Sequence, residues 1–267
     1  MAEQPQPPSE RVAVVIVTYN RADLLTLTLD GLASQTRRPD TVIVVDNASA
    51  DHTPDVLAAR ADLPLQVVRL ADNTGGAGGF HTGMRTAYDQ GFDRIWLMDD
   101  DVVPADDCLA ALLAHDGPCL MVVREDRQGR LVEKSATDFD LRNPLAIRPK
   151  TASVDSAYAT RAELPDEVPL HVVAFEGFMV HRDVVTAIGL PDPSFFIFYD
   201  DADFAIRARR AGFPIVAVRD AVLVRQIDFD QQHALDTWKG FYMYRNLFVV
   251  HFRYGENWAV RLKPWLI

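Results

Sequence analysis

Three adjacent carboxylates follow a short apolar segment in the first half of the chain. Residues 95–98 read Ile-Trp-Leu-Met, and Asp99, Asp100 and Asp101 come directly after them. Adjacent carboxylates repel one another and no Lys or Arg stands among them, so a hard divalent cation with oxygen ligands is their natural partner. Because Asp99 and Asp101 alternate along an extended segment, both point to one side and are the candidate ligands of Mn²⁺ or Mg²⁺.

A second acidic run, Asp200-Asp-Ala-Asp203, lies in the second half of the chain and opens a segment with helical character. We expect Asp203 to begin the helix and to pair with Arg207 four residues later. Asp200 and Asp201 remain free for chemistry. Two acidic runs, each placed at the end of an apolar strand, indicate a single active site.

Alternating strands and helices position these runs. Residues 12–17, 41–45, 65–70 and 94–98 are apolar runs, most of them β-branched, which is typical of buried parallel strands. A leucine-rich segment of helical periodicity separates the first two, and a helix stopped by Gly91 precedes the fourth. The pattern predicts an α/β fold with a mainly parallel open sheet, whose ligand crevice lies at the carboxyl ends of the strands.

The rest of the chain is less regular. Residues 124–170 are charged, contain prolines and lack periodicity, which favours a long excursion near an acceptor site. Apolar runs within 172–180 and at 215–218 predict further order, and a long helix is expected over 234–251.

Four glycines, Gly75, Gly76, Gly78 and Gly79, stand between the third strand and the following helix. Glycines let a backbone run close to a ligand, and amides at the start of a helix can face negative charge. The spacing matches neither a dinucleotide fingerprint nor a P-loop, and a flexible loop is the simpler alternative. Their place before the aspartates favours a role in shaping a ligand pocket.

Composition limits the classes of protein to which the chain can belong. The chain has 267 residues, is 48% hydrophobic and carries a formal net charge of -11, which argues against binding nucleic acid. Cys108 and Cys119 form neither a disulfide nor a zinc pattern, and no apolar run approaches the roughly 18 residues needed to span a bilayer. We therefore expect a cytoplasmic protein.

The C-terminal stretch differs from the rest. Residues 238–267 hold five basic residues against one acidic residue, Glu256, together with nine aromatics. This composition predicts peripheral contact with the inner face of the cell membrane, and a helix packed on the core is the alternative. We divide the chain into a disordered N-terminal tail (1–10), a catalytic domain (11–232) and an aromatic, basic helical segment (233–267).

Five motifs carry a resemblance to family-two GT-A glycosyltransferases, over roughly residues 11–254 and in the order seen in that family. They are Val15-Ile-Val-Thr-Tyr-Asn-Arg21, Val44-Val-Asp-Asn-Ala-Ser49, Asn73-Thr-Gly-Gly-Ala-Gly-Gly-Phe80, Trp96-Leu-Met-Asp-Asp-Asp101 and Phe196-Ile-Phe-Tyr-Asp-Asp-Ala-Asp203. The chain most resembles the galactofuranosyltransferases of cell-wall galactan assembly, with rhamnosyltransferases next. The resemblance implies a GT-A, Rossmann-like nucleotide-sugar-binding fold.

The resemblance also implies how the donor is bound. Thr18, Tyr19 and Arg21 would hold the nucleotide, with Arg21 as a fork of donors for the diphosphate, and Asp46 would bind the ribose or uracil edge. A turn or helix cap is the plainer role for Asp46. Four further residues would contact the donor sugar: Gly75, Gly76, Gly78 and Asp100. Asp99 and Asp101 match the Asp-x-Asp pair that holds a metal on the diphosphate.

For catalysis, the resemblance assigns the general base to Asp201 and binding of sugar hydroxyls to Asp200. A carboxylate suffices as base because the sugar centre becomes cation-like and the acceptor hydroxyl acidifies late in the reaction. Attack opposite the diphosphate inverts the anomeric centre. The implied reaction moves galactofuranose from UDP-galactofuranose to a polyprenyl-diphosphate-linked glycan, and a dTDP-rhamnose-dependent transferase is the alternative.

The sequence departs from the family in one place. A third metal ligand, a His, often follows the helix of the base, yet residues 221–227 contain none and Arg225 or Gln226 occupies the place. His233 is a possible substitute. Tyr244-Arg245-Asn246 matches a feature of related transferases whose Arg faces phosphate, although an Arg beside core-facing aromatics is an equal alternative.

Two hypotheses from other functional classes remain. An apolar strand followed by Asp99-Asp-Asp-Val-Val103 also fits the nucleophile of haloacid-dehalogenase-like phosphatases, but that strand normally comes first in the chain, and here a complete βαβ unit precedes it. A non-catalytic sugar-nucleotide-binding protein is the other, kept open by the missing His.

Overall fold

The computed structural model describes residues 10–146, 148–227 and 236–266. Residues 1–9 of the predicted tail and the predicted boundary between residues 232 and 233 lie outside the described residues. The division into tail, catalytic domain and C-terminal segment therefore stays a prediction.

Strands and helices alternate along the first half of the chain, as the sequence pattern predicts. The strands are β1 (Val12–Thr18), β2 (Thr41–Asp46), β3 (Leu65–Arg69), β4 (Arg94–Asp99), β5 (Val102–Pro104), β6 (Cys119–Glu125), β7 (Ala136–Phe139), β8 (Lys150–Ser153), β9 (Glu167–Leu170), β10 (Phe178–His181) and β11 (Ile215–Arg225). The helices are α1 (Ala22–Ala33), α2 (Thr53–Ala58), α3 (Gly75–Asp89), α4 (Cys108–Leu113), α5 (Val154–Ala157), α6 (Arg182–Ile188), α7 (Asp200–Arg210), α9 (Lys239–Tyr254) and α10 (Trp258–Leu262), with short 3₁₀ turns at Arg161–Glu163, Pro193–Phe195 and Lys263–Leu266.

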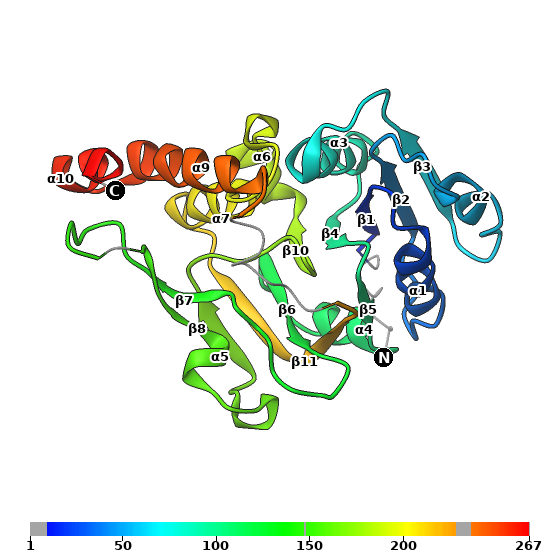
Figure 1. Cartoon of the computed structure of the whole chain (residues 1–267). Helices are drawn as coiled ribbons and strands as arrows, with labels where there is room; N and C mark the ends of the chain where they lie inside the picture. Colours follow the sequence, from blue (N-terminus) through cyan, green and yellow to red (C-terminus); the bar gives the residue numbers. More distant parts are fainter. Residues whose placement is uncertain (1–9, 147, 228–235, 267) are drawn as a thin grey trace.

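A nine-stranded sheet forms the centre of the molecule in the order β3-β2-β1-β4-β10-β6-β11-β5, with β9 pairing with β11 (Figure 1). The block β3-β2-β1-β4 is parallel, as predicted. Beyond it, β10 runs antiparallel to both β4 and β6, while β6 and β11 are parallel. The α/β prediction is confirmed, and the parallel block carries the crevice edge at its carboxyl ends.

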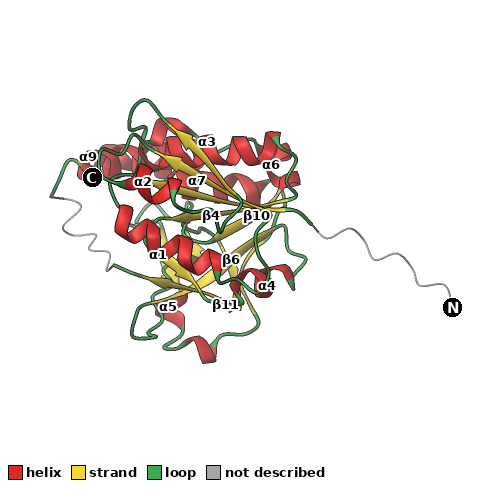
Figure 2. Cartoon of the chain, turned by 90° about the vertical axis from the view of Figure 1, so that its right-hand side faces the viewer, coloured by secondary structure: helices red, strands yellow, loops and turns green. Residues whose placement is uncertain are grey.

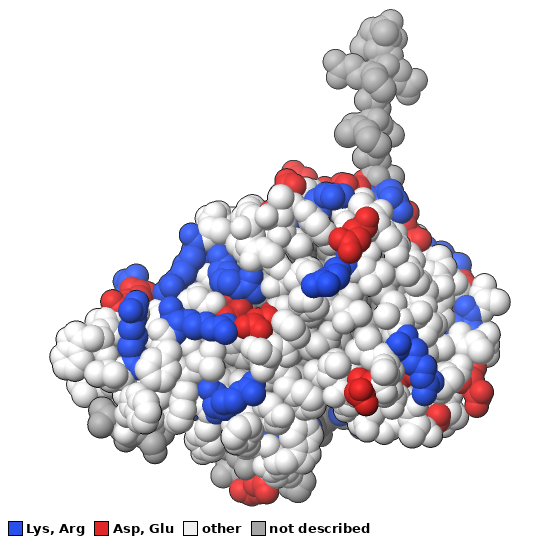
Figure 3. All heavy atoms as spheres, turned by 90° about the horizontal axis from the view of Figure 1, so that it is seen from above, with Lys and Arg blue, Asp and Glu red and all other residues white. Residues whose placement is uncertain are grey.

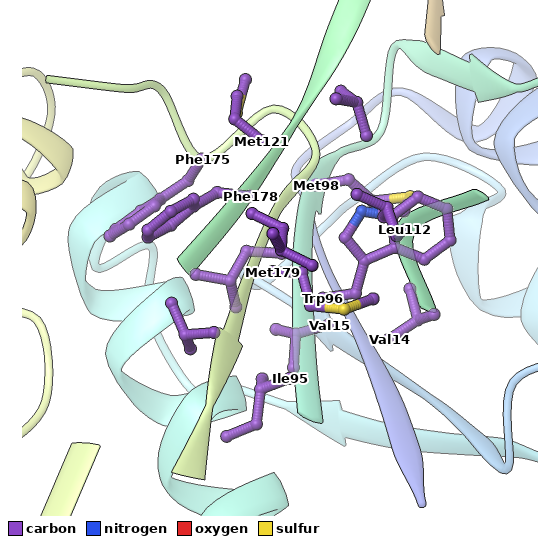
Figure 4. Packing of buried hydrophobic residues seen from close by; sticks show 14 of the residues in the cluster. Val14, Val15, Ile95, Trp96, Met98, Leu112, Met121, Phe175, Phe178 and Met179 are labelled. Atoms are coloured by element: carbon purple, nitrogen blue, oxygen red, sulfur yellow. The ribbon is translucent and has the colours of Figure 1, made fainter. Parts of the chain in front are cut away.

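Helices cover both faces of the sheet (Figure 2). On one face lie α3, α6 and α7, and on the other α1 and α4. The strands are therefore apolar on both sides, which explains why they read as continuous apolar runs rather than as alternating ones. Figure 4 shows how β1, β4 and β10 contribute to this core, with Val14, Trp96 and Phe178 all fully buried.

Three features differ from the sequence-based prediction. The glycines from Gly75 onward form the first turn of α3 rather than a loop before it. The described residues within 124–170 form regular structure, namely the end of β6, the β7–β8 hairpin and β9, which joins the main sheet. The strand predicted at 215–218 extends to Arg225. Short strands with few apolar residues explain why periodicity missed the middle region.

None of the described helices combines the length and the hydropathy needed to cross a bilayer.

Candidate active site

The first two strands and β4 deliver polar side chains to one edge of the sheet. In the parallel register, Thr18 stands beside Asp46, and Val17 stands beside Asp99. Carboxyl ends of neighbouring parallel strands meet at the same edge. Thr18, Asp46 and Asp99, which belong to three separate sequence motifs, therefore lie at one edge of the sheet.

Asp100 and Asp101 are bound to the turn that follows β1. The Thr18 hydroxyl donates to Asp100 at 2.7 Å, and the Arg21 guanidinium lies 3.2 Å from Asp100 and 3.0 Å from Asp101. Burial raises the pKa of Asp100, while Arg21 and Thr18 oppose the increase. Arg21 is thus a cationic partner of the acidic run. It comes from the turn after β1 and not from the sequence next to Asp99.

Asp99 lacks such a partner. Within the described residues, no hydrogen bond or ion pair reaches its carboxylate. Burial raises the pKa of Asp99 well above its ordinary value, and the charges of Asp101 and Glu176 add to the increase. Burial likewise raises the pKa of Asp101 to about 6, with Glu176 adding to it. This excess of negative charge is the environment that a divalent cation relieves.

The donor set fits a cation that also binds a substrate phosphate. Among the described residues, no three His, Cys, Asp or Glu side chains converge so as to hold a metal ion by themselves. Mg²⁺-type ions commonly use one or two carboxylates together with substrate phosphates, and Asp99 and Asp101 meet that smaller requirement.

The segment expected to carry the third ligand does lie beside this cluster. The backbone N–H of Gln226 donates to the Asp101 carbonyl at 2.9 Å. Arg225 pairs with Glu176 through Nε at 3.2 Å. An arginine with a carboxylate partner therefore stands where the family often has a His, and His233 lies outside the described residues.

Glu176 links the two acidic runs, although sequence reasoning missed it. It precedes Gly177, whose N–H donates to the Leu97 carbonyl at the end of β4, and this contact sets Glu176 beside Asp99. Burial raises the pKa of Glu176, but Arg124 and Arg225 outweigh it and hold the pKa below its ordinary value. A single acidic residue in the apolar run 172–180 was the signal that could have found it.

Arg124 is the second residue that the sequence reasoning missed. Its side chain is buried at the end of β6 and pairs with Glu133 and with Glu176, both at 2.7 Å. A buried guanidinium needs this degree of compensation. Its charge also opposes the increase that burial produces in the pKa of Asp201.

The second acidic run begins α7. Asp200 is buried, and burial together with the charge of Asp201 raises its pKa well above the ordinary value. Burial raises the pKa of Asp201 to about 6; the N–H of Ala202, which donates to it at 2.6 Å, opposes the increase, and Glu176 adds to it. Because Glu176 acts on both runs, Asp99, Asp101 and Asp201 share one electrostatic environment.

Asp203 pairs with Arg207 as expected, but the prediction that it begins the helix is wrong, because α7 begins at Asp200. It is buried, accepts from Arg207 at 2.8 Å as the predicted i,i+4 partner, and also accepts from Arg253 and the Tyr254 hydroxyl. These bonds fasten α7 to α9 and leave Asp203 away from the chemistry.

On the nucleotide side, Tyr19 is exposed and Arg21 is half-exposed. Asp46 is buried, accepts from the Ser49 N–H at 2.8 Å and pairs with Arg69 at 3.2 Å. The turn-forming role of Asp46 is therefore present in the structure. The neighbouring Asn47 connects this edge to α3, since its amide donates to the Gly75 carbonyl at 2.8 Å.

The four glycines serve different purposes. A Cβ at Gly75, where φ is 72°, would lie 2.0 Å from the Phe196 carbonyl oxygen, and one at Gly78 would lie 2.3 Å from the Thr74 hydroxyl. A Cβ at Gly79 would lie 2.4 Å from Val17. These three are required by packing. Only at Gly76, of the four, would a Cβ meet no described atom within 4 Å.

Comparisons with known proteins agree with this geometry. Residues 13–129 match the family model described as Glycosyl transferase family 2. The chain is 34% identical over 260 residues to galactofuranosyltransferase GlfT1 of Mycolicibacterium smegmatis, covering 89% of this chain and 82% of the relative. It is 29% identical to galactofuranosyltransferase GlfT2 of Mycobacterium tuberculosis over 93% of this chain and 42% of that protein.

Solved structures share the fold. The mannosyltransferase PcManGT from Pyrobaculum calidifontis, in complex with GDP-Man and Mn²⁺, superposes with a TM-score of 0.64 at 23% identity, over 96% of this chain and 67% of that one. GalNAc-T7 with UDP, GalNAc and Mn²⁺ gives a TM-score of 0.63 at 14% identity, over 91% and 50%. These neighbours show the fold, and the identity to GlfT1 shows the family: the chain belongs to glycosyl transferase family 2, as a GT-A enzyme of the galactofuranosyltransferase type.

Proposed function

We propose that the chain is an inverting, metal-dependent transferase that moves galactofuranose from UDP-galactofuranose to a polyprenyl-diphosphate-linked glycan. The observation that carries the proposal is that Glu176, which is ion-paired with Arg124 and Arg225, adds to the raised pKa of Asp99, Asp101 and Asp201 alike, in a chain 34% identical to a galactofuranosyltransferase. Sugar transfer needs a cation at the leaving group and a proton acceptor at the incoming hydroxyl. The two acidic runs match those two needs.

The nucleotide would lie along the carboxyl ends of β1 and β2. Thr18, Tyr19 and Arg21 would contact it there, and Asp46 would face the ribose or uracil edge while keeping its turn. Arg21 pairs with Asp100 and Asp101 through Nη1 and is half-exposed, so its exposed part can also face a diphosphate oxygen. Asp100 would act through this pairing near the donor sugar.

Asp99 and Asp101 would hold Mn²⁺ or Mg²⁺ together with the donor diphosphate. When bound, the ion supplies positive charge to the diphosphate as it leaves. The Mn²⁺ in solved neighbours of the same fold supports a divalent ion.

Asp201 would take the proton of the acceptor hydroxyl. Its pKa of about 6 makes it a stronger base than an ordinary carboxylate while leaving it ionised at neutral pH. Asp200 would bind hydroxyls of the sugar. Gly75 and Gly78 would shape the donor-sugar pocket through packing, and the open position at Gly76 would face the sugar directly.

Family membership removes the phosphatase hypothesis, and the donor identity can be tested directly. With a rhamnosyl-capped polyprenyl diphosphate sugar and Mn²⁺, we expect UDP-galactofuranose to be consumed with release of UDP. An assay that detects the released nucleoside diphosphate, run with each donor separately, compares UDP release with dTDP release. Equal or faster turnover of dTDP-rhamnose would overturn the donor, and absence of any turnover would favour a binding protein.

The C-terminal helices would provide peripheral membrane contact. Trp258 and Trp265 are 76% and 77% exposed, and Phe252 lies against Trp265. Basic side chains gather on the face that contains α9, around a smaller acidic group (Figure 3). Exposed Trp residues beside cations favour the interface of an anionic bilayer. Lys263 is buried, however, so the aromatic residues carry more of the expected binding than the charge count alone indicates.

Replacing Trp258 and Trp265 together with Ala should weaken binding to vesicles that contain anionic lipid. Wild-type binding should also fall as salt rises, because screening weakens the cationic part. Sedimentation with vesicles measures both effects. Leu27→Ala with Val67→Ala, two exposed apolar residues on α1 and β3, is the matched control. Equal binding of the double Trp variant and wild type would leave the tail a packing element only.

A further inference from the structure

The segment 195–199 turns sharply immediately before the second acidic run. Phe196, Phe198 and Tyr199 have φ angles of 66°, 65° and 67°, in the left-handed region. Residues with a Cβ adopt this conformation rarely, so surrounding contacts have to maintain it. Because the segment leads directly into Asp200 and Asp201, its conformation sets the position of both carboxylates.

Asn246 of α9 contacts this segment from one side. Its side chain is completely buried, and Nδ2 lies within hydrogen-bond distance of three backbone carbonyls, those of Phe195 (3.0 Å), Ile197 (2.8 Å) and Phe198 (2.9 Å). Its Oδ1 accepts from the Nε of Arg245 at 2.8 Å, which fixes the orientation of the amide.

The start of α3 contacts the same segment from the other side. The N–H of Ala77 donates to the Phe196 carbonyl at 3.1 Å, and Gly75 packs so closely on that carbonyl that a side chain has no room. The segment 195–199 therefore lies between the glycine turn of α3 and the Asn246 amide.

We propose that Asn246 is a positioning residue for the transfer reaction. Its hydrogen bonds set the segment 195–199, and with it Asp200 and Asp201, against the glycine turn that faces the donor sugar. The inference rests on the proposed function for its catalytic meaning. The contacts of Arg245 favour the alternative of an Arg beside core-facing aromatics, since it donates to the carbonyls of Ser194 and Phe195 and stacks on Tyr242.

The side-chain amide is the group suited to this position. One nitrogen with two hydrogens serves three converging carbonyl oxygens, and a carboxylate would repel them. An aliphatic side chain would remove the side-chain donor from the carbonyls of Ile197 and Phe198, whereas the Phe195 carbonyl also accepts from Arg245 and from the Ile197 N–H. Among the described residues, no backbone N–H of a turn or loop donates to the carbonyls of Ile197 and Phe198 in its place.

Asn246→Leu tests the proposal, since it keeps the volume and removes the donors. We expect kcat to fall at least about tenfold, because displacing a reacting group by about 1 Å can cost about a hundredfold. UDP affinity should stay close to wild type, since the nucleotide contacts lie at β1 and β2. Asn246→Ala, which removes the same donors without steric demand, serves if the Leu variant does not fold.

The matched control is His251→Leu. His251 is buried in the same helix, and its contact goes to the Leu247 carbonyl within α9 rather than to the segment 195–199. Hydrogen exchange of peptides covering 195–203 should rise in the Asn246 variants and remain at the wild-type level in the control.

The pH profile separates positioning from a general loss of stability. Glu176, Arg124 and Lys150 face Asp201 from other elements and stay in place. If the segment loosens, Asp201 gains water and the acid limb of kcat/KM moves to lower pH, whereas partial unfolding lowers the profile without moving it.

Normal kcat or unchanged exchange in the Asn246 variants would overturn the proposal. A wild type inactive with every donor would refute the transferase function, while the exchange result would still decide whether Asn246 holds the segment.

Discussion

Asp201→Asn should lower kcat by at least about a hundredfold, the lower end of the range for loss of a general base. The amide keeps the shape of the side chain but takes up no proton. Binding of UDP in the presence of Mn²⁺ should remain, because Asp201 lies on α7, apart from the nucleotide contacts. In wild type, kcat/KM should fall as pH drops below about 6, where Asp201 becomes protonated. Steady-state kinetics and calorimetry give both quantities.

Two comparisons make this result specific. Asp200→Asn should raise KM for the donor more than it lowers kcat, since Asp200 is assigned to sugar hydroxyls. Asp183→Asn alters an exposed carboxylate in the first turn of α6 and should leave kinetics unchanged. Near-normal turnover of Asp201→Asn would move the base to Asp200.

Asp99→Asn and Asp101→Asn should each abolish transfer and remove the metal dependence of UDP binding. Both variants lose one of the two carboxylates available to a cation beside the diphosphate. Titration of UDP with and without Mn²⁺ shows the effect. Asp106→Asn, an exposed carboxylate a few residues later, is the control. Unchanged metal-dependent affinity in both variants would refute the assignment.

The same substitutions should stabilise the ligand-free fold. The pKa of Asp101 is about 6 in the folded state against an ordinary value of 3.8, so its ionised form costs stability above pH 6. That cost shrinks as pH falls through 6 and is absent below about 3.8, where both states are protonated. The melting temperature of Asp101→Asn should thus exceed that of wild type most at pH 7 and above, and the difference should vanish toward pH 4. If Asp101→Asn were less stable than wild type at pH 7, the ion pair between Asp101 and Arg21 would outweigh the unfavourable burial of the ionised carboxylate and its repulsion by Glu176 and Asp100.

Much of the fold was predictable, because buried parallel strands leave a strong signal. The apolar runs ending at Thr18, Asp46 and Asp99 specify both the parallel block and its polar edge. The middle region was not predictable, since β7, β8 and β9 are four-residue strands with few apolar residues; β7 and β8 pair with each other, and β9 pairs with the distant β11.

The residues of the candidate site were also predictable only in part. Aspartates in runs are visible in a sequence, whereas Glu176 is a single acidic residue in an apolar run, Arg124 is one of several charged residues at 124–127, and Asn246 follows Arg245 in a mainly apolar helix. Their importance comes from partners that are distant in sequence: β10 brings Glu176 to β4, and α9 brings Asn246 to the turn before α7. The role of the glycines could not be told from the sequence either. Gly75 has no room for a side chain because the carbonyl of Phe196, more than a hundred residues away in the chain, packs against it.

The most direct test is proton NMR of the product formed from UDP-galactofuranose, a rhamnosyl-capped polyprenyl diphosphate sugar and Mn²⁺. We expect one new galactofuranosyl residue on the acceptor, with an anomeric configuration opposite to that of the donor, and an equal amount of UDP. Retention of configuration, or release of free galactose and UDP without a new glycosidic bond, would contradict the placement of Asp201 as base opposite the departing diphosphate.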